Sequence, residues 1–203
     1  MIEHLNRKIF LFFNANYYTP HWKIVGTIYL AKYLIYIIPL LVIFLWFWSA
    51  DHSIYYYRQI VLKSILTIVI ALLISSCIRQ YFPHPRPFQQ GLGYLFIKHS
   101  LTSSTPSNHG TVIFSFALSF LWGARLLWMG VVLFMIGIIL AWSRIYLGLH
   151  WPLDMIIALL VALIGCFLAQ YVWSICGIRL FNWILKIYRY YFYFLIRKGW
   201  IKS

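Results

Sequence analysis

Long apolar stretches alternate with short polar ones along most of this chain, and they restrict the folds that it can adopt. Hydrophobic residues make up 63% of its 203 residues and charged residues only 10%, whereas about a quarter of the residues of a soluble domain are charged. A helix that crosses a bilayer needs about 20 predominantly apolar residues. The sequence therefore predicts an all-α, polytopic membrane helix bundle.

Five apolar stretches reach or approach the length of one membrane span. They cover approximately residues 22–48, 60–78, 110–122, 126–142 and 153–176. The second and third are short between their charges, so we expect their ends to lie at interface depth. We expect a single membrane-embedded domain over residues 1–203, with about five to six spans.

Both ends of the chain have the composition of interfacial helices. Arg7 and Lys8 precede a short apolar patch, and no small-residue cleavage site follows it, which argues against a secretory signal. In the tail, four basic residues fall on one helical stripe among aromatic and aliphatic residues: Arg179, Lys186, Arg189 and Arg197. This pattern predicts an amphipathic interfacial helix, with a partial sixth span as the alternative.

With five spans, the two main polar segments, residues 79–109 and 143–154, lie on the same face of the membrane. The opposite face and the tail hold more Lys and Arg once the arginines of these two segments are set aside as site residues. Positively charged loops stay in the cytoplasm. We therefore expect a cytoplasmic tail and polar segments that face outward.

The net charge of +14 raises the question of a nucleic-acid partner. The basic residues are scattered between apolar stretches and form no concentrated face, so we expect no nucleic-acid binding. Membrane lipids with anionic head groups, or a phosphorylated substrate, account for the charge better. Cys77, Cys166 and Cys176 lie in apolar stretches without metal-ligand spacing, and we expect them to be reduced and structural. The sequence carries no signal for an oligomeric state.

His150 and Asp154 stand four residues apart where the last apolar stretch begins. Asp154 is one of only three acidic residues in the chain, and a carboxylate beside a membrane span is costly unless it has a function. It could hold the imidazole of His150 in one tautomer and stabilise the cation that forms during a reaction. Taken alone, the pair could also be a structural helix start.

Three arginines and the start of a helix point to a phosphate site. The arginines are Arg79, Arg86 and Arg144, and guanidinium groups bind phosphate in a planar, bidentate way. Ser107 and Asn108 precede the third apolar stretch, where free backbone N–H groups and the helix dipole favour an anion. Ser107 could alternatively serve only as an N-cap.

The chemistry that these groups allow is phosphoryl transfer through a histidine. His150 is the candidate nucleophile, with Asp154 stabilising the resulting cation, and His109 is the candidate proton donor to the leaving oxygen. The arginines would neutralise the equatorial oxygens of a loose transition state. The chain has no acidic cluster, so we expect no metal and no other cofactor.

The polar clusters resemble the signature of the type-2 phosphatidic acid phosphatase superfamily. That signature is a basic residue, six residues, Arg-Pro; then Pro-Ser-Gly-His; then Ser-Arg, five residues, His, three residues and Asp. This chain matches it at Arg86-Pro87, Pro106-Ser107, His109, Ser143-Arg144, His150 and Asp154. It departs from the signature at Arg79, where lysine is usual, and at Asn108, where glycine is usual.

The resemblance implies a phosphohistidine mechanism, with His150 as nucleophile, His109 as acid and then base, and Asp154 as the orienting residue. It implies phosphate binding by Arg79, Arg86, Ser107, Asn108, His109 and Arg144. The two departures bear on this site: the arginine keeps the charge but changes the geometry, and the asparagine keeps its backbone N–H but can alter the turn.

A second resemblance, which extends over nearly the whole chain, points to one family within this superfamily. It rests on residues 82–88, 109–114, 141–154 and 196–200. These segments resemble the bacitracin-resistance type of undecaprenyl-diphosphate phosphatase of Gram-negative bacteria. That family removes the terminal phosphate of the polyprenyl diphosphate carrier at the outer face of the inner membrane, so that the carrier is reused for peptidoglycan synthesis. The resemblance implies this lipid substrate, a multi-pass inner-membrane location and an active site that faces the periplasm.

Other interpretations are open at this point. The same motifs serve phosphatases of phosphatidylglycerophosphate or phosphatidic acid, and phosphotransferases that act on lipid A. A non-catalytic membrane protein that binds phospholipid is a more distant alternative. Lys32, within the first span, is either a snorkelling side chain or a contact for the diphosphate. His84 lies in a loop outside the signature, where we expect a solvated or gating side chain.

Overall fold

The chain folds into a bundle of helices, and the computed structural model describes residues 1–47, 53–98, 100–123 and 126–202. Within these ranges all regular secondary structure is helical, which confirms the predicted all-α class. The elements are α1 (Ile2–Phe13), α2 (His21–Tyr33), η1 (Leu34–Tyr36), α3 (Ile37–Phe47), α4 (Ile54–Tyr81), η3 (Pro87–Gln90), α5 (Asn108–Leu121), α6 (Leu127–Tyr146), α7 (Pro152–Tyr191) and α8 (Tyr193–Arg197). The end of the first predicted span, residue 48, lies outside the described residues.

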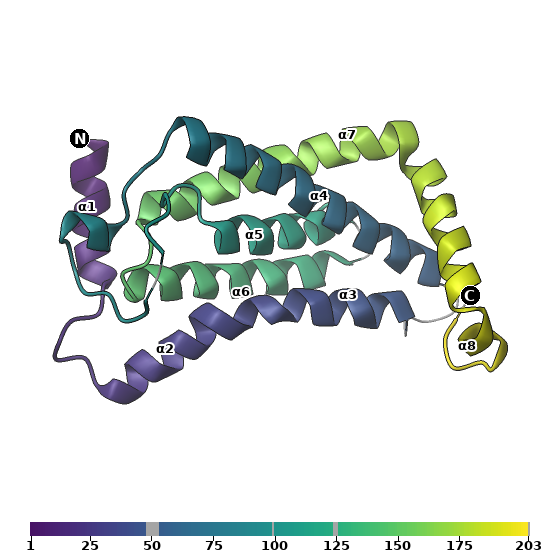
Figure 1. Ribbon diagram of the computed structural model, residues 1–203, viewed down its shortest axis with the longest axis horizontal. Coiled ribbons are helices and arrows are strands. Elements are labelled where there is room, and N and C mark those ends of the chain that lie inside the picture. The colour runs from purple at the N-terminus through teal and green to yellow at the C-terminus, as the bar shows by residue number, and fades with distance from the viewer. Residues whose placement is uncertain (48–52, 99, 124–125, 203) are drawn as a thin grey trace.

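Four helical segments of the described chain are long and apolar enough to cross a membrane, which identifies a membrane protein. They are His21–Phe47, which joins α2, the 3-10 turn η1 and α3, and the helices α4, α6 and α7. The third predicted span falls on α5, which has only 14 residues. α5 packs against α4, α6 and α7 inside the bundle (Figure 1). Because its neighbours enclose it, the thickness of the bilayer does not set its length.

Small and hydroxyl-bearing side chains let the helices approach closely. α4 and α7 meet at Ala71 and Gly165, where a Cβ added to the glycine would lie 2.8 Å from the Cβ of Ala71. α4 and α5 are joined by a hydrogen bond of 3.1 Å from the Ser119 hydroxyl to the Thr67 hydroxyl. Such contacts hold membrane helices together where lipid and protein surfaces are equally apolar.

The C-terminal part of the chain closes the end of the bundle. α7 is 40 residues long, so the basic stripe of the tail lies on a helix that is continuous with the last span. No proline follows Pro152, and the helix has no strong reason to stop. Figure 1 shows the second half of α7, in yellow, turning across the end of the bundle. There the buried guanidinium of Arg58 donates to the carbonyls of Trp46 (3.0 Å) and Lys202 (2.7 Å).

We expect Gly165→Ala to destabilise the protein, because the new methyl group would lie 2.8 Å from the Cβ of Ala71. Overpacking of this kind costs about 1–3 kcal/mol, which thermal unfolding in detergent would report as a lower midpoint. Gly26→Ala is the matched control, since a Cβ at this helical position has no neighbour within 4 Å and alanine favours a helix. Equal midpoints for the two variants would contradict the close α4–α7 contact.

Candidate active site

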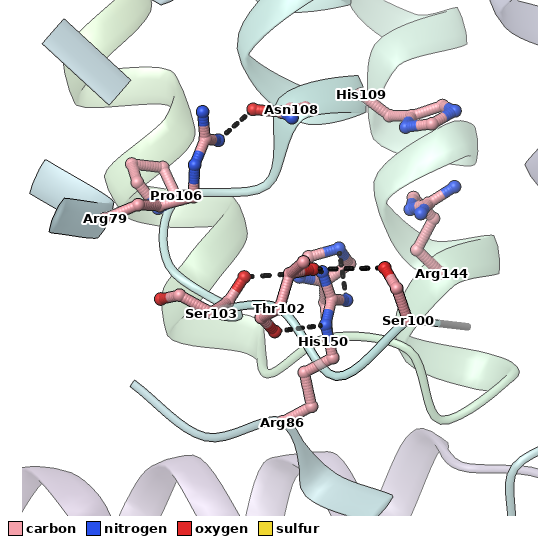
Figure 2. A pocket seen from close by; sticks show the side chains of 10 residues that line it. All are labelled: Arg79, Arg86, Ser100, Thr102, Ser103, Pro106, Asn108, His109, Arg144 and His150. Carbon is pink, nitrogen blue, oxygen red and sulfur yellow. Dashed lines mark hydrogen bonds between the residues drawn. The ribbon is translucent and has the colours of Figure 1, made fainter. Parts of the chain in front are cut away.

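The polar clusters meet at one end of the bundle, where α4 and α6 end and where α5 and α7 begin (Figure 1). They surround a cavity of about 330 Å³. Its lining residues are Arg79, Arg86, Ser100, Thr102, Ser103, Pro106, Asn108, His109, Arg144 and His150 (Figure 2). The structure thus brings together all three predicted arginines and both predicted histidines. Ser107 and Asp154 are buried directly behind the wall of this cavity.

His150 is placed by the start of α7. Pro152 is the first residue of that helix, and Asp154 accepts the backbone N–H of Trp151 at 2.8 Å, which caps it. The same Asp154 oxygen lies 3.2 Å from Nδ1 of His150. One carboxylate, that of Asp154, therefore both caps the start of α7 and orients His150. The two interpretations of the pair are compatible.

Two hydroxyl groups that the sequence did not single out complete the surroundings of Asp154. The Ser104 hydroxyl donates to Oδ2 and the Thr105 hydroxyl donates to Oδ1. Both side chains are buried. They lie just before Pro106, in the long polar segment, and only their position next to that motif could have drawn notice to them. Asp154 is thereby tied to residues about 50 positions earlier in the chain.

Burial keeps the imidazole of His150 neutral. Removal from water lowers its pKa from 6.5 to about 3, although the hydrogen bond to Asp154 acts in the opposite direction. With Nδ1–H donated to Asp154, the lone pair of the ring lies on Nε2. Nη1 of Arg86 is 3.1 Å from that nitrogen and donates a hydrogen bond to it. The nitrogen that would attack a phosphate is therefore covered by an arginine in this structure.

Arg86 is held in place by the loops around it. Its guanidinium donates to the carbonyl of Leu149 at 2.8 Å and to the carbonyl of Thr102 at 3.0 Å. Burial lowers the pKa of Arg86, while the charge of Asp154 raises it. From an ordinary value of 12.5, a lowered pKa still leaves a cation at neutral pH. The site thus presents a fixed positive charge directly beside His150.

The other two arginines occupy different sides of the cavity. Arg144 is buried at the end of α6 and donates to the carbonyl of Ala31 at 3.3 Å, while its Nε has no hydrogen-bond partner among the described residues. Figure 2 shows Arg144 and His109 on one side and Arg79 on the other. An unsatisfied N–H on a buried cation favours an anion in the cavity.

The two positions that depart from the family signature contact each other. Nη1 of Arg79 donates to the side-chain oxygen of Asn108 (Figure 2), and Nη2 donates to the hydroxyl of Ser76 at 3.0 Å. A glycine in place of Asn108 could not accept this bond. The asparagine therefore positions the guanidinium group that stands where lysine is usual.

Ser107 acts as the N-cap of α5. Its hydroxyl accepts the backbone N–H of Gly110 at 3.4 Å, and its own backbone N–H points to the carbonyl of Asp154 at 3.5 Å. The side chain is fully buried. Asn108 and His109 are the first two residues of α5, and both line the cavity. The predicted anion site at the start of α5 would therefore be formed by the backbone and side chains of these two residues.

α1 supports the site from outside, a role that the sequence did not reveal. The side-chain amide of Asn14, just after α1, donates to the carbonyls of Tyr94 (3.1 Å) and Tyr146 (3.0 Å). The backbone N–H of Tyr94 returns a bond of 2.7 Å to the Asn14 oxygen. Gly148 has φ +77°, and a Cβ there would lie 2.2 Å from the Tyr94 carbonyl oxygen. These contacts fix the turn that leads to His150.

Metal ligands are scarce at this site. In the described part of the chain, no three His, Cys, Asp or Glu side chains lie close enough to share a metal ion. The donor set of the cavity is instead rich in cations and hydroxyl groups, which suits an anionic ligand.

Comparison with known proteins agrees with this arrangement. Residues 60–178 match the model of the PAP2 superfamily. The chain is 43% identical over 203 residues, all of both chains, to the putative undecaprenyl-diphosphatase YbjG of Escherichia coli K12. It is 29% identical over 141 residues, 70% of each chain, to the undecaprenyl-diphosphatase BcrC of Bacillus subtilis 168.

A solved structure shows the same fold. The crystal structure of Aquifex aeolicus LpxE superposes with a TM-score of 0.67 at 24% identity, over 82% of this chain and 95% of that one. At this level of identity, the likeness establishes the fold and no more.

We expect stability to fall on acidification because of His150. In the folded state the pKa of His150 is about 3. Between about pH 6.5 and 3, His150 is therefore protonated in the unfolded chain and neutral in the folded one. From about pH 7.5 to 5.5 this linkage removes about 1 kcal/mol. Unfolding midpoints of the wild type and His150→Gln at both pH values would show it as a steeper loss in the wild type. Parallel losses would mean that His150 titrates normally.

We also expect Arg79 and Asn108 to be energetically coupled. Arg79→Met and Asn108→Gly each remove the hydrogen bond between them, so the second change should cost less when the first is present. A double-mutant cycle on unfolding midpoints should give a coupling of about 0.5–1 kcal/mol, modest because Asn108 is exposed. Unfolding free energies that change strictly additively in the double variant would show that Arg79 and Asn108 do not interact.

Proposed function

The chain belongs to the PAP2 superfamily, and from this we propose that it is an undecaprenyl-diphosphatase, which releases the terminal phosphate of the polyprenyl diphosphate carrier. The observation that carries the proposal is a neutral histidine, His150, oriented by Asp154 and facing a cavity with three arginines. Full-length similarity to a relative with that name supports the substrate.

The reaction begins at Nε2 of His150. This nitrogen attacks the terminal phosphorus, a P–N bond forms, and the P–O bond to the bridging oxygen breaks. His109 donates a proton to that oxygen, which leaves as part of the lipid monophosphate. Asp154 stabilises the positive charge that appears on the imidazole. Water then attacks the phosphorus of the phosphohistidine and gives a proton to His109. The P–N bond breaks, its electron pair returns to Nε2 of His150, and inorganic phosphate leaves.

The arginines bind the phosphoryl group throughout. A loose transition state spreads negative charge over three equatorial oxygens, and Arg79, Arg86 and Arg144 surround the cavity on different sides. Arg86 moves its N–H from Nε2 of His150 to a phosphate oxygen when the substrate enters. The backbone N–H groups at the start of α5 add to this binding.

The site faces the periplasm from the inner membrane. Support comes from the charge of the opposite end, where the tail crosses the bundle (Figure 1). The tail holds Arg179, Lys186, Arg189, Arg197, Lys198 and Lys202. By the positive-inside rule such a cluster stays in the cytoplasm. A periplasmic site also matches the place where a spent carrier lipid becomes available for reuse.

Two other functions use the same groups. Structural likeness at 17% identity to a phosphatidylglycerolphosphate phosphatase of Bacillus subtilis shows only a shared fold, and a monophosphate lipid would occupy the same cavity. A non-catalytic lipid-binding role would retain the arginines but gain nothing from a neutral, oriented histidine.

The decisive experiment measures phosphate release from undecaprenyl diphosphate by the purified protein in detergent with EDTA. We expect His150→Ala to lower kcat by about 10⁴-fold or more, because the covalent path is lost. His21→Ala, at an exposed position outside the cavity, is the matched control and should retain full activity.

Each outcome assigns a function. Release from phosphatidylglycerophosphate alone would keep the histidine mechanism and change the substrate. A folded wild type that releases no phosphate from any lipid, or a fully active His150→Ala, would overturn the enzymatic proposal.

A further inference from the structure

A second cavity adjoins the reaction cavity. It measures about 370 Å³, and the two share His109 and Arg144 in their walls. Lys32 from α2 and Lys98 from the loop after η3 also line it, together with Tyr33 and Tyr36. Residues more than 60 positions apart therefore bring two ammonium groups next to the wall that holds the candidate proton donor.

The position of Lys32 is unusual for a charged side chain. It lies inside the apolar segment His21–Phe47, which is long enough to cross a membrane. Ionisable side chains in such segments are rare and mark substrate or ion pathways. Immediately after it, the helix passes through the 3-10 turn η1, and mid-helix 3-10 turns often accompany functional sites.

No acidic side chain in the described part of the chain is available to neutralise these lysines. Glu3 is paired with Arg7 at 3.1 Å, and Asp154 is buried against His150. The second cavity is therefore cationic, and an anion is the ligand that fits it.

We propose that Lys32 and Lys98 bind the second phosphate of the diphosphate, the one that stays on the lipid. The inference rests on the proposed function. In an in-line displacement, the leaving oxygen departs on the side of phosphorus opposite to the attacking Nε2 of His150. The acid that meets it is His109, and beyond His109 lies the second cavity. The departing lipid monophosphate thus leaves its phosphate between the two lysines.

The aromatic side chains beside this subsite show where the lipid goes. Tyr33 and Tyr36 are more than half exposed, and Tyr29 stacks on Tyr33 with ring centroids 5.5 Å apart. They form a row along the outer face of α2 and η1. A prenyl chain attached to the phosphate in the subsite reaches the bilayer along this row.

The subsite makes the protein selective for diphosphates. Lys32 and Lys98 contact a group that a monophosphate lacks, and they offset the charge that develops on the leaving group. Removing both cations with Lys32→Gln and Lys98→Gln should lower kcat/KM for undecaprenyl diphosphate by about 30–100-fold. The fold-decrease in kcat/KM of each single variant should be about a tenth to a third of that of the double variant.

The test compares two inhibitors of this hydrolysis. A short prenyl methylenediphosphonate, which is not cleaved, fills both cavities, whereas inorganic phosphate fills the reaction cavity alone. In the double variant, Ki for the diphosphonate should rise by about 30–100-fold, while Ki for phosphate should change by less than about threefold. Lys32→Arg should retain wild-type inhibition, because it restores the cation.

Lys23→Gln is the matched control. Lys23 lies on the same helix, is exposed and lines neither cavity, so it removes one charge without touching the subsite. A double variant whose Ki for the diphosphonate matches that of Lys23→Gln, or rises only as much as its Ki for phosphate, would overturn the subsite. A wild type that does not hydrolyse undecaprenyl diphosphate would refute the proposed function instead, which keeps the two failures distinct.

Discussion

The buried carboxylate of Asp154 is the constraint on which the active-site end of this protein depends. A charge enclosed at the end of an apolar bundle must be hydrogen-bonded, and here the donors are His150, the backbone of Trp151 and the hydroxyls of Ser104 and Thr105. Satisfying one carboxylate therefore fixes the first turn of α7, the loop before α5 and the orientation of the imidazole. The proposed catalytic geometry therefore follows from the hydrogen bonds that the buried carboxylate of Asp154 requires.

Much of this end could be predicted from the sequence because its signals are local. The spacing of His150 and Asp154 is one helical turn, and the apolar stretches on either side show which polar segments share a membrane face. The partners of Asp154 could not be predicted, because Ser104 and Thr105 are about 50 residues away and any hydroxyl in the long loop was an equal candidate. The role of Asn14 could not be predicted for the same reason, because its hydrogen bonds join loops that are distant in the chain.

The details of the fold that the sequence left open lie where the length of an apolar stretch is a poor guide. α5 is too short to be recognised as a span by length, since its neighbours, and not the lipid, surround it. α7 continues through the basic stripe of the tail, because a change from apolar to amphipathic composition does not break a helix. Lys32 had two interpretations from sequence alone, and only the meeting of α2 with the loop that carries Lys98 gives reason to prefer a substrate contact.

The hydrogen bond between Arg86 and Nε2 of His150 has a consequence for the reactivity of the imidazole. A buried, neutral imidazole with a free lone pair would react with small electrophiles that happen to diffuse into the cavity. The guanidinium of Arg86 donates to that lone pair in this structure. In the proposed reaction, Arg86 turns from this nitrogen to an oxygen of the entering phosphate, so the substrate itself would expose the atom that attacks it.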